Sequence, residues 1–468
     1  MFMSRELLDK IIKAYDIRGL VDEEINPDFT FALGIAFAKF VEREREPATI
    51  VIGEDMRPSS PELATAFSDG ITSQGLDVIR IGLASTDQLY FASGNLNLPG
   101  AMFTASHNPA QYNGIKLCKS GARPIGQESG LLWIKDQIHL GMTEGFPIPH
   151  RSLGKESSQD LLPHYVDFLF SLFPQGSFDT LFVGRPIRIA IDAGNGMGGH
   201  TAPAVMAKIN AVVDGIYFEL DGTFPNHEAN PIEAKNLVDL QKLVRTKQAD
   251  IGLAFDGDAD RCFLVDEKGD LVSPSALTAL IAERELKKNP GSSIIYNLIC
   301  SRAVPEVIKE NGGVALRSRV GHSYIKKMMA ENGAIFGGEH SGHFYFQDFW
   351  NADSGMLAAL YAIAALLDQQ EPLSTLLSRF NRYSLSGEIN TKVDDTRAAI
   401  AAIKEEFARS SQEATYDDLD GLTVTTPDWT FNVRPSNTEP VLRLNVEARS
   451  FEEQVRVRDL VLRILADR

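Results

Sequence analysis

Residues 251–266 read IGLAFDGDADRCFLVD: an apolar run, a loop with three carboxylates and a second apolar run. The first run predicts a fully buried strand, which is typical of parallel sheets covered by helices on both faces. Two further stretches have the same form, TIVIGED at 49–55 and IRIAIDAG at 187–194. Each predicts a strand that delivers glycine and acidic residues at its carboxyl end, where open α/β sheets bind ligands. The likeness indicates a duplicated α/β module.

The bulk composition is that of an ordinary globular protein. The chain has 468 residues, 44% hydrophobic and 23% charged, which predicts three or four domains at about 100–200 residues each. It has neither a secretory signal pattern nor an apolar run near the ~18 residues of a membrane helix. The three cysteines form no CxxC pair, which favours the cytoplasm. A net charge of −17 argues against nucleic-acid binding, so we expect neither nucleic acid nor membrane as a partner.

The acidic loop DGDADR is the strongest chemical signal. Asp256, Asp258 and Asp260 alternate with small residues, so their carboxylates can converge on one cation, and oxygen ligands suit Mg²⁺. A calcium EF-hand is one alternative because Glu267 falls at position 12, but Arg261 stands where the sharp turn requires glycine. An exposed acidic turn is another alternative, although a strand ending in three like charges needs a neutralising partner.

The motif TASHNP places Ser106 in a polar turn just after the apolar run 100–103. Pro109 ends any helix there and biases Asn108 toward an extended conformation. The hydroxyl either forms the turn or acts as a nucleophile. The chain contains neither the G-x-S-x-G elbow of an α/β-hydrolase nor the P-loop of a kinase.

A glycine-rich turn, GNGMGG at 194–199, follows a predicted strand and precedes a helical stretch. This is the context of a dinucleotide fingerprint, and Asp214 and Glu219 lie at about the distance of a ribose contact. A nicotinamide-dependent oxidoreductase is therefore a second function class. The alternative is a tight strand-to-helix turn in which glycine serves the backbone angles.

Two downstream loops suit a phosphorylated sugar. GEHSGH at 338–343 offers a carboxylate, a hydroxyl and two imidazoles to vicinal hydroxyls, and its spacing does not match a helical zinc site. RPSNTEP at 434–440 sets a guanidinium beside two hydroxyls and an amide, groups that bind phosphate. A structural turn is the alternative in both loops.

In chain order, the motifs supply a hydroxyl, a hard-metal loop, a polyol loop and a phosphate loop, with the cations Arg18 in YDIRG and Lys116 in NGIK nearer the start. Together they indicate phosphoryl transfer on a sugar phosphate. The chain resembles the α-D-phosphohexomutase family, and most closely its bacterial phosphomannomutase members. YDIRG, TASHNP, DGDADR, GEHSGH and RPSNTEP occur in the family's order and spacing through nearly the whole chain.

The resemblance implies a mutase that uses one Mg²⁺ per chain and a hexose 1,6-bisphosphate activator. Ser106 is implied to be a phosphoserine. The implied metal ligands are Ser106, Asp256, Asp258 and Asp260. The implied contacts to sugar hydroxyls are Glu339 and Ser341, with His343 close by. The implied contacts to the phosphate that is not transferred are Arg434, Ser436, Asn437 and Thr438, while Arg261 supports the phosphate or the metal loop.

The family's fold has four domains around a central cleft, three related α/β modules and a C-terminal α+β domain, so the resemblance implies this α/β class. Breaks in the sequence fall at 145–160, near 268–270 and near 369–372 or slightly beyond. We therefore expect domain I with the phosphoserine loop at 1–150, domain II with the metal loop at 160–268, domain III with the sugar-binding loop at 269–378 and domain IV with the phosphate-binding loop at 384–468. The glycine-rich turn then becomes a structural turn of domain II.

Two positions depart from the family pattern. Ile299 stands where several relatives place a substrate-binding lysine, so Arg317, Arg319 or His322 could supply that charge. The segment GLASTD at 82–87 lacks the prolines usual there.

The general base is left open among Lys116, Arg18 and His343, although arginine rarely titrates. The predicted reaction interconverts mannose 6-phosphate and mannose 1-phosphate, and the SGH ending of GEHSGH also fits a dual mannose/glucose enzyme. A non-catalytic sugar-phosphate sensor is disfavoured by the intact metal and serine loops. We expect a small sugar phosphate as the partner and a monomer or homodimer as the assembly.

Overall fold

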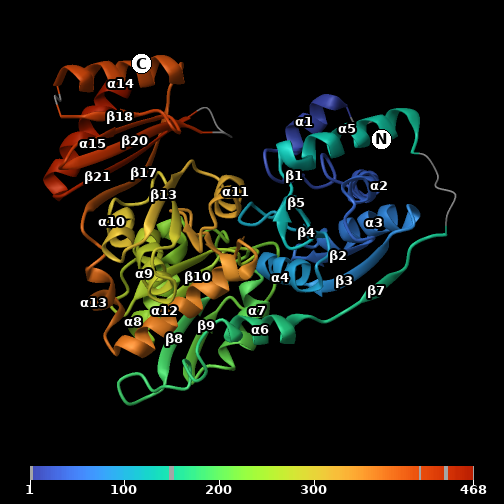
Figure 1. Ribbon diagram of the computed structural model, residues 1–468, viewed down its shortest axis with the longest axis horizontal. Helices are drawn as coiled ribbons and strands as arrows, with labels where there is room; N and C mark the ends of the chain where they lie inside the picture. Colours follow the sequence, from blue (N-terminus) through green and yellow to red (C-terminus); the bar gives the residue numbers. More distant parts are fainter. Residues whose placement is uncertain (1–3, 147–151, 411–412, 437–440, 467–468) are drawn as a thin grey trace. The chain divides into compact units, whose positions relative to one another are not determined.

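The computed structural model describes residues 4–146, 152–410, 413–436 and 441–466 (Figure 1). The chain forms two compact units. Unit 1 comprises Met1–Ser273 and Ser341–Leu376, and unit 2 comprises Pro274–His340 and Leu377–Arg468. Among the described residues, we find no helix that is both long and apolar enough to cross a bilayer.

Unit 1 begins with a mixed sheet in the order β1-β5-β4-β2-β3-β7, with β6 paired to β5. β4, β2 and β3 run parallel, whereas β5 is antiparallel to β4 and β1. The strands are β1 (Ile17–Leu20), β2 (Thr49–Glu54), β3 (Asp77–Leu83), β4 (Gly100–Phe103), β5 (Tyr112–Lys119), β6 (Arg123–Pro124) and β7 (Glu156–Ser158). The helices are α1 (Arg5–Ile11), α2 (Pro27–Glu44), α3 (Ser60–Ser73), α4 (Thr86–Leu96) and α5 (Leu132–Glu144), the last preceded by the short π-helical η1 (Gln127–Leu131). β7 lies within the stretch predicted as a linker.

The helices of this first sheet pack an aromatic core beneath the turn that follows β4. α2 begins where the Asn26 side chain accepts a hydrogen bond from the backbone N–H of Phe29, a usual N-cap arrangement. Phe67 of α3 stacks 5.9 Å from Phe37 of α2 and meets Phe103, the last residue of β4, edge-on at 5.4 Å. Ring pairs of this geometry stabilise a core beyond their buried area, so the strand end before Thr104 is firmly held.

The second sheet of unit 1 has the order β11-β10-β8-β9, with only β11 antiparallel to its neighbour. Its strands are β8 (Ile187–Asp192), β9 (Ala211–Ile216), β10 (Ile251–Phe255) and β11 (Cys262–Asp266). Its helical segments are α6 (Leu162–Ser171), α7 (Gly198–Met206), η2 (Ala234–Leu237) and α8 (Val238–Lys247). Every residue of β10 is buried, as predicted. The stretches at 187–194 and 251–266 turn out to be neighbouring strands of one sheet, so their likeness does not mark separate modules.

The remaining part of unit 1 is a β-hairpin followed by an apolar helix. Its elements are β15 (Phe344–Phe346), η3 (Gln347–Phe349), β16 (Ala352–Asp353) and α12 (Gly355–Gln369), and α13 (Leu373–Ser378) follows along the chain. α12 begins after Ser354, whose side chain accepts from the N–H of Leu357. Nearly all of α12 is buried, as expected for a helix that is hydrophobic on every side.

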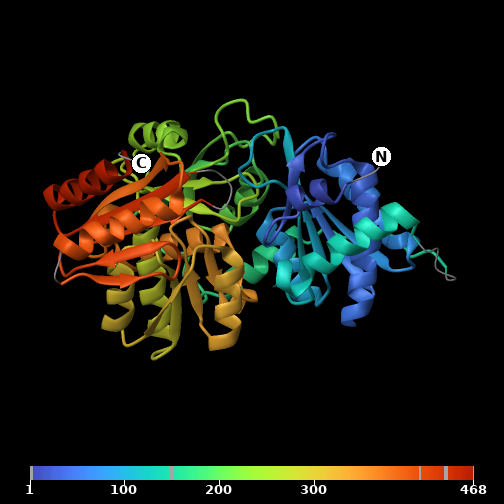
Figure 2. The same cartoon turned by 90° about the horizontal axis from the view of Figure 1, so that it is seen from above.

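Unit 2 combines a parallel and an antiparallel part. The parallel strands β12 (Ser293–Asn297), β13 (Val314–Ser318) and β14 (Phe336–Gly338) accompany α9 (Pro274–Lys288), α10 (Ala303–Glu310) and α11 (His322–Asn332). The antiparallel sheet has the order β17-β21-β20-β19-β18. Its strands are β17 (Ser384–Lys392), β18 (Thr415–Asp417), β19 (Leu422–Thr425), β20 (Trp429–Pro435) and β21 (Val441–Ala448). α14 (Thr396–Ser410) and α15 (Phe451–Ala466) pack on this sheet and on each other (Figure 2).

Candidate active site

The Ser106 turn follows β4 directly and is buried. Ser106 has φ 51°, a left-handed conformation that costs a non-glycine residue roughly 1–2 kcal/mol. Its N–H donates to Thr104 Oγ1 at 2.9 Å, and its Oγ donates to Asp256 Oδ2 at 2.9 Å. Arg261 Nη2 approaches the same Oγ at 3.4 Å. The serine and the acidic loop, far apart in sequence, therefore meet in the folded chain.

A residue that the sequence did not single out holds this turn. Arg57 is 1% exposed, and its guanidinium donates to four backbone carbonyls of the turn. These are the carbonyls of Ser106, Asn108, Pro109 and Tyr112, at 2.9, 2.7, 2.9 and 2.9 Å. The charge is balanced by Asp55 at 3.2 Å. The sequence shows an arginine two residues after GED at 53–55. It does not show that this side chain reaches carbonyls about fifty residues away.

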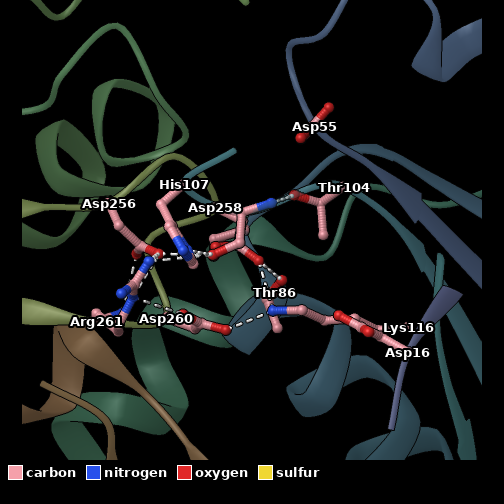
Figure 3. A network of polar contacts seen from close by, with 12 residues as sticks. Asp16, Asp55, Thr86, Thr104, His107, Lys116, Asp256, Asp258, Asp260 and Arg261 are labelled. Carbon is pink, nitrogen blue, oxygen red and sulfur yellow. Dashed lines mark hydrogen bonds and ion pairs between the residues drawn. The ribbon is translucent and has the colours of Figure 1, made fainter. Parts of the chain in front are cut away.

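The acidic loop lies between β10 and β11, with its carboxylates turned toward one another (Figure 3). The ligand atoms of Asp256, Asp258 and Asp260 lie within 4.8 Å of one another, and all three residues are buried. Lys116 Nζ donates to Asp258 Oδ2 at 2.7 Å and to Asp260 Oδ2 at 2.6 Å. Arg261 Nε donates to Asp256 Oδ2 at 2.8 Å. Two cations thus face three carboxylates.

Burial and charge shift the pKa values of this cluster in opposite directions. Burial raises the pKa of Asp256, and its carboxylate neighbours add to the rise. Burial also disfavours ionisation of Asp258, but the ammonium of Lys116 outweighs it and holds the pKa of that carboxyl below its usual range. The desolvated Lys116 would lose its proton more easily, yet Asp258 and Asp260 raise its pKa well above the ordinary value. Lys116 is therefore an ammonium in this arrangement.

The cluster fits a hard divalent cation. Within the described residues, Asp258 Oδ1 and Asp260 Oδ1 are buried and have no hydrogen-bond partner. A buried carboxylate oxygen without a partner is costly, and a cation would satisfy both atoms. Oxygen donors alone match Mg²⁺ better than softer metals.

His343 and Arg18 border the same cluster within unit 1. His343 Nε2 lies 3.6 Å from Asp260 Oδ1, and its Nδ1 lies 2.8 Å from Ser341 Oγ. Arg18 of β1 donates to Asn108 Oδ1 at 2.5 Å, which ties it to the Ser106 turn. All three predicted base candidates therefore surround the serine and the aspartates.

The glycine-rich turn packs beneath the acidic loop. Met197 donates its N–H to the carbonyl of Gly257 at 2.8 Å, and a Cβ added to Gly196 would meet the same carbonyl at 2.6 Å. A Cβ on Gly257 would in turn lie 2.3 Å from the carbonyl oxygen of Ser106. Because the turn's amide is already bonded to protein, this contact favours a structural turn over a dinucleotide site.

The other predicted binding residues lie in unit 2. Glu339 follows β14, is 2% exposed, and its Oε1 accepts from the N–H of Gly321 at 3.2 Å. Arg434 at the end of β20 donates to Glu388 Oε2 at 2.7 Å, while its Nη1 is buried with no hydrogen-bond partner among the described residues. Ser436 accepts from Arg443 at 3.2 Å. Asn437 and Thr438 lie outside the described residues, as does the side chain of His322.

The candidates for the charge missing at Ile299 differ in their partners. Arg317 donates to Asp417 Oδ2 at 2.5 Å and to Thr423 Oγ1 at 3.0 Å. Arg319 is exposed and stacks 5.3 Å from the centre of the Tyr324 ring. Arg317 is thus engaged between protein groups, whereas Arg319 faces solvent.

Comparison with known families covers almost the whole chain. The phosphoglucomutase/phosphomannomutase alpha/beta/alpha domains I, II and III match residues 9–141, 164–269 and 273–383, and the C-terminal domain matches residues 388–464. The chain belongs to the phosphoglucomutase/phosphomannomutase family. This confirms the predicted family, the predicted fold class and the prediction of a phosphohexomutase-type enzyme.

Individual relatives agree with the family match. The chain is similar to a phosphomannomutase of Escherichia coli K12, at 39% identity over 93% of this chain and 94% of the relative. A protein of Xanthomonas campestris named as phosphohexose mutases is 37% identical over 93% and 94% of the two chains. A crystal structure of a phosphoglucomutase/phosphomannomutase family protein from Burkholderia thailandensis superimposes with a TM-score of 0.85, at 29% identity over 99% and 97% of the chains.

Proposed function

We propose that this chain is a phosphomannomutase, which interconverts mannose 6-phosphate and mannose 1-phosphate through a phosphoserine at Ser106 and a hexose 1,6-bisphosphate. The 2.9 Å contact between Ser106 Oγ and Asp256 Oδ2 carries the proposal. This contact joins the hydroxyl of Ser106, in TASHNP, to a carboxylate that is able to hold a cation. The names of the relatives similar to this chain support mannose as the sugar.

The reaction consists of two phosphoryl transfers. The P–O bond to Ser106 Oγ breaks as a bond forms between phosphorus and the oxygen of a free sugar hydroxyl. The proton of that hydroxyl passes to a base, and Ser106 Oγ takes up a proton as it leaves. The bisphosphate then turns end for end, and its other phosphoryl group returns to Ser106. Arg261, already 3.4 Å from Oγ, would hydrogen-bond the phosphoryl oxygens, which suits a guanidinium.

Mg²⁺ would be held by Asp256, Asp258 and Asp260 with an oxygen of the seryl phosphate, one ion per chain. When bound, it supplies positive charge that stabilises the developing charge of phosphoryl transfer. The chain's own task is to keep the three carboxylates converged and dry. The two buried carboxylate oxygens that have no hydrogen-bond partner among the described residues support this assignment.

We infer that His343 accepts the sugar proton. Lys116 stays protonated while it pairs with two carboxylates, and an arginine side chain is a poor proton acceptor. The Nδ1 of His343 lies 2.8 Å from Ser341 Oγ and its Nε2 lies 3.6 Å from Asp260 Oδ1, which places the ring beside the acidic cluster. A mutase assay tests the assignment: His343→Gln should lower kcat by about 10²–10⁴-fold while sugar phosphate still binds, whereas an unchanged kcat would contradict it.

Sugar and phosphate recognition would fall to Ser341 of unit 1 and to the loops of unit 2. Glu339 and Ser341 would bind the sugar hydroxyls, with the unreacted phosphate taken by Arg434, Ser436, Asn437 and Thr438. The unpartnered Nη1 of Arg434 supports a phosphate contact there. The charge absent at Ile299 would come from Arg319, since Arg317 is bonded within the protein, and His322 is a further candidate.

Phosphopeptide mapping and a mutase assay test the proposal together. Protein purified with phosphatase inhibitors should carry phosphate on Ser106, and Ser106→Ala should lose turnover while still binding sugar phosphate. Ser73→Ala, at the end of α3, serves as a matched control and should remain active. The assay compares mannose 1-phosphate with glucose 1-phosphate, each primed with its own bisphosphate. Normal turnover by Ser106→Ala would refute the mechanism, and equal rates on both sugars would indicate a dual enzyme.

A further inference from the structure

A buried carboxylate at the start of α4 connects three separate segments of unit 1. Asp87 is 1% exposed. It accepts hydrogen bonds from Tyr165 Oη of α6 at 2.7 Å and from Ser354 Oγ, before α12, at 2.6 Å. Ser85 Oγ is a third donor. No ion pair to Asp87 is found among the described residues, so hydroxyl groups alone compensate its burial.

The neighbouring Thr86 holds a candidate metal ligand. Thr86 is fully buried, and its N–H donates to the carbonyl of Asp258 at 3.0 Å. Its Oγ1 also donates to Asp258 Oδ2 at 2.6 Å. With Lys116 on the same oxygen, the carboxylate of Asp258 is fixed through Oδ2, which leaves Oδ1 as the buried oxygen without a hydrogen-bond partner.

The start of α12 lies against the same acidic loop from another direction. A Cβ added to Gly355 would lie 2.7 Å from the carbonyl of Arg261 and 2.9 Å from that of Ala259. The preceding Ser354 is the residue bonded to Asp87. One carboxylate therefore holds two helix starts, and both are in contact with the loop that bears the aspartates.

We propose that Asp87 and Thr86 are positioning residues of the metal site: Asp87 locks the start of α4 to α6 and α12, so that Thr86 orients the Asp258 carboxylate toward the bound cation. The proposal rests on the metal dependence of the proposed function. Groups that orient a metal ligand without touching the metal typically change metal affinity by roughly 10–100-fold. Their loss should weaken cation binding more than the rate at saturating cation.

Manganese binding, followed by the EPR signal of free Mn²⁺, is a readout independent of turnover. Thr86→Val should raise the Kd for Mn²⁺ roughly 10-fold or more and raise the Mg²⁺ concentration for half-maximal mutase activity in parallel, with kcat at saturating Mg²⁺ within about threefold. Thr86→Ser keeps the hydroxyl and should restore affinity. Thr30→Val, which also alters a buried threonine in the first turn of a helix, is the matched control and should bind like the unaltered chain.

Asp87→Asn and Tyr165→Phe extend the test to the carboxylate. Each variant removes part of the Asp87 hydrogen-bond network without altering Thr86, and each should weaken Mn²⁺ binding severalfold. These two variants keep the proposal testable if Thr86→Val does not fold. If these variants and Thr86→Val bind Mn²⁺ like the unaltered chain, the positioning role is overturned while the metal site stands. If the unaltered chain itself binds no Mn²⁺, the proposed metal site falls, and this inference falls with it.

Discussion

Replacing Lys116 with methionine should reveal how the acidic cluster is stabilised when no metal is bound. Its ammonium lies 2.7 Å from Asp258 and 2.6 Å from Asp260, whose side chains are 0% and 1% exposed. Removing one partner of a buried ion pair costs about 3–5 kcal/mol, because the remaining charge stays buried. At about 2 °C per kcal/mol for a large unit, Lys116→Met should lower the melting temperature in EDTA by roughly 6–10 °C.

Magnesium should reverse most of this loss. A ligand present at 100 times its Kd stabilises the folded state by about 2.7 kcal/mol, and in Lys116→Met the cation need not displace an ammonium. The assay is calorimetric unfolding of both proteins in EDTA and in saturating Mg²⁺. Lys119→Met, on the same strand, loses a more exposed pair with Glu44 and should cost about 0–1 kcal/mol in either buffer. Equal destabilisation of Lys116→Met with and without Mg²⁺ would refute the reasoning.

Three further predictions follow from other contacts. Gly257→Ala would bring a Cβ to 2.3 Å from the Ser106 carbonyl oxygen, and a displacement of the Ser106 turn by about 1 Å should cut mutase turnover about 10²-fold. In the control Gly126→Ala the added Cβ would lie 3.2 Å from its nearest neighbour, so this variant should stay active. An active Gly257→Ala would contradict the close approach. Burial lowers the pKa of His227, but its hydrogen bond with Asp192 outweighs this and raises the pKa overall. The pairing therefore stabilises the folded state fully below the unfolded pKa of about 6.5, and this stabilisation is lost as pH rises through the folded pKa. The difference in melting temperature between the unaltered chain and His227→Gln should narrow between pH 6 and 8.5, and a widening difference would disprove the pairing. All three cysteines are buried, and burial raises the pKa of the Cys300 thiol to about 12. A thiol reagent should therefore label no cysteine in the folded protein and all three after unfolding. Rapid labelling of the folded chain would contradict this burial.

The meeting of the serine and the aspartates was implied by the family resemblance, while the residues themselves indicated that each motif follows a buried strand. Ser106 follows β4 of the first sheet and Asp256 follows β10 of the second, and each motif stands at the carboxyl end of its strand, where open α/β sheets bind ligands. The motif types also identified the chemistry of each loop. Family resemblance supplied the rest, including the C-terminal domain.

Contacts that depend on long side chains from distant segments could not be predicted from the sequence. Arg57 reaches carbonyls about fifty residues away, and Thr86 meets Asp258 across 172 positions. Neither contact leaves a periodic or spacing signal, because each is made by one side chain that reaches a distant segment of the chain. The likeness of the stretches at 187–194 and 251–266 was misleading as a sign of copied modules, because the two strands are neighbours in one sheet. Neighbouring strands of one sheet are buried on both faces alike and so have similar composition, just as equivalent strands of two copied modules do.

The hydrogen bonds from Arg57 to four backbone carbonyls have a consequence for protein design. Ser106 has a left-handed conformation, and a guanidinium from the loop that follows β2 donates to the carbonyls of its turn. Grafting residues 104–109 onto another α/β scaffold would transfer the hydroxyl without its conformation. The smallest transplantable unit is discontinuous and has to include Arg57 together with its carboxylate partner, Asp55.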